Sequence, residues 1–187
     1  MNTNFLGRFL MTTILVAGAA VASAASKDTS PQTDEQLTKR ITHEVLMYPR
    51  YTIWDDINFR VSNGQVELTG AVTEPVKKSD LTNIIKGVPG VTSLTNDLKV
   101  LPLSPMDNRL RLQLARVIYR DPSLSRYALG AHPSIHIIVD NGHVTLDGVV
   151  ATEMDKEIAS VRASSTGLSF GPVVNNLQVE HPAPKKS

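Results

Sequence analysis

Apolar residues along this chain change between strand-like and helix-like spacing, and the same order of spacings occurs twice. Residues 57–72 (INFRVSNGQVELTGAV) and 135–150 (IHIIVDNGHVTLDGVV) each hold two runs of alternating apolar and polar residues around an Asn-Gly pair. Alternation with a period of two is typical of a strand with one buried face. Asn-Gly supplies the two positive φ angles that a two-residue type I′ turn needs. The sequence therefore predicts two copies of one β-hairpin.

The position of each Asn-Gly pair sets the register of its hairpin. Counting outward from Asn63-Gly64 pairs Val61 with Val66 and Arg60 with Glu67, so apolar side chains share one face. A hairpin that is apolar on one face needs a single covering layer. A glycine near the end of the second strand is expected to end the regular pairing, at a bulge or at a close helix approach. The predicted structural turn residues are Asn63, Gly64, Gly70, Asn141, Gly142 and Gly148.

Helical spacing flanks each hairpin. Thr33 and Gln36 fit a capping box before the first helix, and Pro75 fits the first turn of the second. A further strand closes each unit, at 91–100 and at 173–179. The predicted fold class is α/β (α+β), with two tandem α-β-β-α-β domains, each a three-stranded mixed sheet covered by two helices. The predicted buried helix positions are Leu37, Ile41, Val45, Leu81, Ile84, Ile85, Val88, Leu110, Leu114, Val117, Ile118, Ile158 and Val161.

The N-terminus has the three parts of a secretory signal peptide. Arg8 supplies positive charge, residues 9–21 are apolar, and Ala22-Ser23-Ala24 fits a cleavage site. A retained membrane anchor is the alternative interpretation. The chain has no cysteine, which excludes disulfides, thiolate catalysis and lipidation through cysteine. The expected boundaries are a signal peptide 1–24, a disordered leader 25–32, domains 33–101 and 106–180, a linker 102–105, and a flexible tail 181–187.

The duplicated motifs resemble the BON domain. The closing motif reads Gly90, Val91, Leu94, Asn96, Leu98 and Val100 in the first copy, and the second copy departs from it by placing Ser169-Phe170 where Gly-Val is usual. The resemblance implies non-enzymatic binding modules of the bacterial envelope, located in the periplasm. It also implies phospholipid binding and a role in envelope maintenance or osmotic stress protection. It brings no catalytic residues and no cofactor.

Candidate chemistry in the second hairpin is weak. The register places His136 opposite Asp147 and Asp140 opposite His143. The two pairs lie on the order of 13 Å apart along the strands, at about 3.3 Å per residue. Metal ligands must lie within about 2 Å of one ion, so the pairs cannot share a metal. We therefore predict no catalytic residue, no metal and no cofactor, and interpret both pairs as surface cross-strand pairs.

The third helix carries the candidate binding surface. Arg109, Arg116 and Arg120 fall within about 40° of one another around the helix axis, and Leu112 and Tyr119 are predicted to form an apolar ridge beside them. The second domain has seven basic and eight acidic residues, so any attraction is local. The near-neutral chain lacks the basic footprint of a nucleic-acid binder.

Arginines beside apolar side chains suit anionic phospholipid headgroups. The alternative partner is an envelope protein, with the chain acting as an adaptor on an outer-membrane or secretion component. A solvated face that also packs against the other domain is the interpretation without function. No transmembrane segment is expected after signal cleavage. The predicted membrane or partner-binding residues are Arg109, Leu112, Arg116, Tyr119, Arg120 and Arg126.

Overall fold

Both hairpins form, and their residues pair in the predicted register. The computed structural model describes residues 33–130, 132–167 and 169–180. The predicted signal peptide, leader and tail lie outside the described residues. In the first hairpin Val61 faces Val66 and Arg60 faces Glu67. The turn residues Asn63 and Asn141 both have φ of 51°, as a type I′ turn requires.

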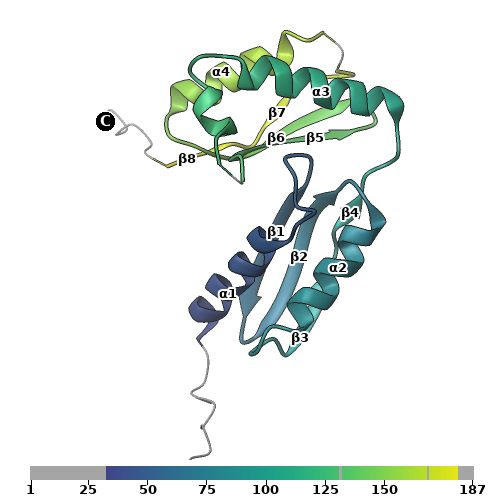
Figure 1. Cartoon of the computed structure of the whole chain (residues 1–187), viewed down its shortest axis with the longest axis vertical. Helices are drawn as coiled ribbons and strands as arrows, with labels where there is room; N and C mark the ends of the chain where they lie inside the picture. Colours follow the sequence, from purple (N-terminus) through teal and green to yellow (C-terminus); the bar gives the residue numbers. More distant parts are fainter. Residues whose placement is uncertain (1–32, 131, 168, 181–187) are drawn as a thin grey trace, which may run out of the picture. The chain divides into compact units, whose positions relative to one another are not determined.

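The first repeat follows the predicted order of elements. Its two helices lie on the same side of the sheet (Figure 1). The long strand β2 is central, because β1 pairs with it antiparallel and the closing segments pair with it in parallel. The elements are α1 (Asp34–Met47), β1 (Asp56–Ser62), β2 (Gln65–Val72), α2 (Pro75–Lys86), β3 (Ser93–Asn96) and β4 (Lys99–Val100).

The second repeat has the same topology with one added turn of 3₁₀-helix. Strand β6 is central, with β5 antiparallel to it and the closing segments parallel to it. The extra residues between the helix and the hairpin form η1. The elements are α3 (Pro105–Tyr119), η1 (Ser125–Ala128), β5 (Ile135–Asp140), β6 (His143–Val150), α4 (Glu153–Ser164), β7 (Val174–Asn175) and β8 (Gln178–Val179).

Each closing strand is split in two, where one continuous strand was predicted. The side chain of Asn96 causes the break in the first repeat, because its Oδ1 accepts the N–H of Leu98 at 3.1 Å. Its Nδ2 donates to the carbonyl of Lys78 in α2 at 3.1 Å. Asn175 makes the corresponding bonds in the second repeat. The asparagine of the closing motif therefore fastens the sheet to the helix above it.

Gly70, near the end of β2, does not end the pairing of β2 with β1. Gly70 pairs with Ile57, and the ladder continues by one more residue. Gly70 and Gly148 have φ of 111° and 117°. A Cβ on Gly70 would lie 2.2 Å from the carbonyl oxygen of Asp56. The close approach is therefore to the facing strand, and the predicted bulge or helix approach is wrong.

Each repeat encloses its own apolar core between the helices and the sheet. Most of the predicted helix positions lie in these cores, with Leu37, Ile41 and Leu81 almost fully buried. Helix α4 is the exception, because Val161 is 66% exposed while Ala159 and Ala163 are buried. Asp155 is buried as well and sets the phase, since residues 155, 159 and 163 share one face. The prediction that Val161 lies in the core is wrong.

Candidate functional site: the exposed face of helix α3

Helix α3 begins at a cap that the sequence indicates. The Oγ of Ser104 accepts the N–H of Asp107 at 3.1 Å, and Pro105 occupies the first turn. The carboxylate of Asp107 in turn accepts the N–H of Asn141 at 3.0 Å and that of Gly142 at 2.9 Å. These bonds fix the N-terminus of α3 against the hairpin turn. The rotation of the helix is thereby set, with Leu110, Leu114 and Ile118 buried.

The opposite face of α3 is exposed and carries the three predicted arginines. Arg109, Arg116 and Arg120 are all exposed. Leu112 is 59% exposed beside them, and Met106 is 64% exposed one turn before Arg109. Leu103, just before the helix, is 89% exposed. The result is a helix face, hereafter the α3 face, that combines guanidinium groups with exposed apolar side chains. Leu103 and Leu112 also line a hollow with Trp54 of the first repeat.

Two predicted members of this surface lie elsewhere. The hydroxyl of Tyr119 donates to the carbonyl of Ile135 in β5 at 2.5 Å, and burial raises its pKa. Arg126 in η1 forms an ion pair with Asp155 and stacks over the ring of Tyr127. Tyr119 therefore does not form the predicted exposed ridge. The guanidinium of Arg126 is held by contacts within the second repeat. Met106 is the exposed apolar residue that the sequence interpretation missed, although its i−3 spacing from Arg109 is a visible signal.

The C-terminal half of the α3 face borders a basic hollow. Arg116 and Arg120 of α3 and Arg162 of α4 line a cavity of about 410 Å³ between the ends of the two helices. Nε of Arg162 donates to Asp121 at 2.7 Å, which holds that guanidinium in place. The backbone N–H of Ser123 and then Arg162 lower the pKa of the Asp121 carboxyl. An anionic group in this hollow would meet the guanidinium groups of Arg116 and Arg120, while Asp121 offsets the charge of Arg162.

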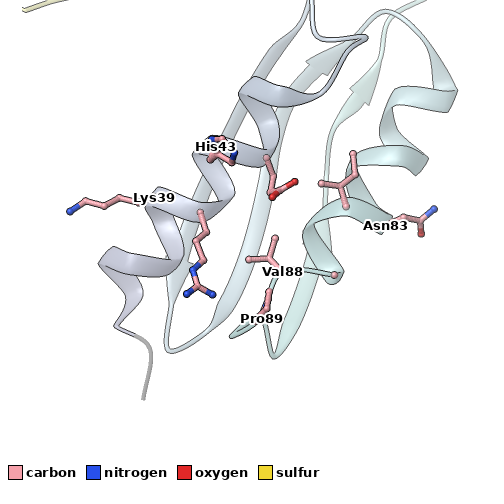
Figure 2. A pocket seen from close by; sticks show the side chains of 9 residues that line it. Lys39, His43, Asn83, Val88 and Pro89 are labelled. Atoms are coloured by element: carbon pink, nitrogen blue, oxygen red, sulfur yellow. The ribbon is translucent and has the colours of Figure 1, made fainter. Parts of the chain in front are cut away.

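A larger hollow, of about 690 Å³, lies in the first repeat between α1 and α2. Figure 2 shows Val88 and Pro89 at its base and the side chain of Lys39 pointing away from α2. Nζ of Lys39 is bonded to Glu35 at 2.8 Å. Arg40 and His43 also line this hollow, together with the carboxylate of Glu44. Its lining is thus of mixed charge, and we assign the candidate site to the α3 face, which the sequence predicted.

The histidine–carboxylate pairs of the second hairpin face each other as predicted. His136 lies opposite Asp147 and Asp140 lies opposite His143. The prediction that both are surface pairs is wrong for His136, because its ring stacks on Tyr51 at 5.3 Å between centroids and its Nδ1 is buried. Burial lowers the pKa of His136 and raises that of Asp147, so burial disfavours an ion pair between them. Within the described ranges no group of three or more His, Cys, Asp or Glu side chains could hold a metal ion.

A duplicated α-β-β-α-β unit of this kind defines a tandem module protein, and comparison with known proteins identifies the module. A family model for the BON domain matches residues 33–102 and 107–181. The chain therefore belongs to the BON-domain family. BON-domain proteins are typically non-enzymatic binding proteins and are associated with the cell envelope.

Solved structures add a likeness of low identity. Two chains of CdsD, a structural protein of the type III secretion system of Chlamydia trachomatis, match with 20% identity and a TM-score of 0.29. The match covers 77% of this chain and 61% and 64% of the two CdsD chains. A comparison with curated proteins gives no match.

Proposed function

We propose that this protein is a non-enzymatic periplasmic binding protein that associates with anionic phospholipid surfaces through the α3 face. The observation that carries the proposal is the exposure of Arg109, Arg116 and Arg120 together with Met106 and Leu112 on one side of a helix. Membership of the BON-domain family supports it. Its role would be envelope maintenance or protection during osmotic stress.

The energetics of the α3 face suit reversible binding. An arginine near an anionic membrane surface contributes about 1 kcal/mol, so three contribute roughly 3 kcal/mol. Burying the exposed parts of Met106 and Leu112 in the interface adds about 25 cal/mol for each Å² of apolar surface removed from water. A face of this kind lies on the bilayer, with its arginines among the headgroups.

The proposed location follows from the predicted signal peptide. Cleavage near Ala24 would release the remaining chain into the periplasm, or to the exterior. None of the helices in the described ranges combines the length and apolar character that crossing a bilayer requires. Contact through one amphipathic face fits this proposal.

Vesicle co-sedimentation tests the proposal. The purified protein should sediment with vesicles that contain phosphatidylglycerol, and a variant with Arg109, Arg116 and Arg120 changed to Glu should stay in the supernatant. The matched control changes Lys39, Arg50 and Lys86 to Glu, which alters the net charge equally on exposed positions of the first repeat outside β1. Equal loss of binding in the control would show that net charge, and not the α3 face, is responsible.

An adaptor that docks on an envelope protein is the second candidate, and helix α4 supports it. Met154 and Val161 lie on its outward side and are 63% and 66% exposed. Exposed apolar residues rimmed by polar ones are typical of protein-interaction sites. Changing both residues to Gln should leave vesicle binding unchanged and remove binding to a protein partner, whereas the arginine variant should do the reverse.

A further inference from the structure

The outer strands of the two repeats, β1 and β5, differ in whether side chains bond to their outer edge. In a two-residue hairpin the residues next to the turn form a hydrogen-bonded pair, and pairs along the strand then alternate. The backbone N–H and C=O groups of Ile57, Phe59 and Val61 therefore point away from β2. In the second repeat the same alternation means that the backbone groups of Ile135, Ile137 and Val139 point away from β6.

Helix α3 covers the outer edge of β5 with two side chains, and the carbonyl of Ile53, in the connection before β1, accepts the N–H of Ile137 at 2.7 Å. The Tyr119 hydroxyl donates to the carbonyl of Ile135 at 2.5 Å, and the Arg111 guanidinium donates to the carbonyl of Val139 at 2.6 Å. Arg111 is only 5% exposed, so its charge is committed to this contact and to Asn108. Side chains that cover a strand edge prevent a further strand from pairing there.

Helix α1 lacks both closing residues. Asp34 and Asp107 bind the two hairpin turns in the same way, which aligns the helices and places Thr38 at the position of Arg111 and Leu46 at that of Tyr119. The Thr38 hydroxyl donates to the carbonyl of Asp34. In the part of the chain that the structure describes, no hydrogen bond reaches the outward groups of β1.

We infer that β1 is a pairing edge for a second copy of this chain. An antiparallel pairing centred on Phe59 places Phe59 opposite Phe59 and Ile57 opposite Val61 of the other copy. The contact is thus isologous, and every outward N–H meets an outward C=O.

The side chains along β1 fit this register. Ile57, Phe59 and Val61 are only partly buried by their own core, so apolar surface remains for the second copy. Aromatic and β-branched side chains that face each other across antiparallel strands stabilise the pair. On the other face Arg60 lies opposite Asn58 and diagonal to Asp56 of the second copy, which avoids directly opposed like charges. One strand pair is smaller than a standard interface, so the dimer is weak and reversible.

A transfer of the closing residues tests this inference. Sedimentation velocity on the purified protein should show a monomer–dimer equilibrium that depends on concentration. The variant Thr38→Arg/Leu46→Tyr, which copies the closing residues of α3, should weaken the dimer at least about tenfold. The control Lys39→Arg/Met47→Tyr adds the same side chains to exposed positions one residue further along α1 and should dimerise like the wild type.

A cysteine probe tests the register independently of the closing residues. The chain has no native cysteine. Phe59→Cys should form a disulfide-linked dimer on oxidation, because paired strands bring facing residues within disulfide range. Glu67→Cys on β2 should not form one. A protein that stays monomeric at all concentrations, or a dimer unaffected by Thr38→Arg/Leu46→Tyr, would overturn the inference. If the protein is monomeric, the β1 edge would instead be available to pair with a strand of another protein.

Discussion

Single carboxylates set the geometry of both repeats. Asp34 and Asp107 each accept the two backbone N–H groups of an Asn-Gly turn, at distances between 2.7 and 3.0 Å. A turn with two positive φ angles leaves these N–H groups pointing outward, and a carboxylate at a helix N-terminus is well placed to accept them. One residue per repeat thus joins the first helix to the hairpin, and the sequence spacing alone did not predict this contact.

Gly148→Ala should destabilise the protein through both strain and collision. The residue has φ of 117°, and a Cβ would lie 2.0 Å from the carbonyl oxygen of Ser134. We expect a loss of about 2 to 4 kcal/mol in urea unfolding, since backbone strain alone costs about 1 to 3 kcal/mol. Gly167→Ala is the control, because its φ is also positive but no atom lies within 4 Å of the added Cβ. Equal losses of stability for the two variants would show that the collision with the Ser134 carbonyl adds nothing to the backbone strain.

Asp155 gives the second repeat a dependence on pH. Its burial alone would raise the pKa of the carboxyl, but hydrogen bonds from Thr152, Tyr127 and Arg126 outweigh burial and lower it. A lowered pKa means that the carboxylate stabilises the fold above the ordinary Asp pKa of about 3.9, and that this contribution disappears as the pH falls through the folded-state value. Asp155→Asn should therefore lower stability at pH 7 but make the acid branch of the stability curve shallower. A parallel shift of the two curves at all pH values would contradict this.

At the scale of elements, the second helix of each repeat is anchored by an ion pair, and the two pairs have opposite polarity. The pair is fully buried in the first repeat, whereas its arginine is half exposed in the second. Lys77 in α2 binds Asp55 in the preceding connection at 2.7 Å, whereas Asp155 in α4 binds Arg126 in the corresponding connection. The structural role is shared although the charges are exchanged. Sequence comparison of the repeats did not identify this role, because exchanged charges read as unrelated residues.

Lys77→Met should destabilise the first repeat strongly. Lys77 is 2% exposed and Asp55 is fully buried, so the variant leaves an uncompensated carboxylate in the core. Removing one partner of a buried pair costs about 3 to 5 kcal/mol. Thermal unfolding of Lys77→Met and of the exposed control Lys86→Met measures the difference. A loss below about 1 kcal/mol for Lys77→Met would show that the pair does not anchor α2.

The spacing of apolar residues predicted the helices and strands well where only local interactions decide the structure. The hairpin registers and the capping box at Thr33 follow from local chemistry, and both are confirmed. The outcome differed where a tertiary contact competes with the pattern. Val161 faces outward because buried Asp155 sets the phase of α4, and Tyr119 turns to the β5 edge because a free carbonyl lies there.

At the scale of the whole molecule, duplication gives a common scaffold on which the two repeats differ in their exposed chemistry. The α3 face has Arg116 and Arg120 where the aligned positions of α1 have His43 and Met47. The first repeat instead has the open edge of β1. A protein with a lipid-facing helix in one repeat and a pairing edge in the other would present two α3 faces on association. Two faces bind a membrane more tightly than one where both can reach it at the same time.

The partition coefficient onto vesicles, measured as a function of phosphatidylglycerol content, tests most directly whether the α3 face binds anionic lipid. Neutralising Arg109, Arg116 and Arg120 to Gln should reduce partitioning onto anionic vesicles about a hundredfold, at about 1 kcal/mol for each arginine. The wild type should also bind more weakly as salt concentration rises, because counterions screen the headgroups. An unchanged partition coefficient for the triple Gln variant, or equally strong wild-type binding to neutral vesicles, would contradict the assignment of the α3 face.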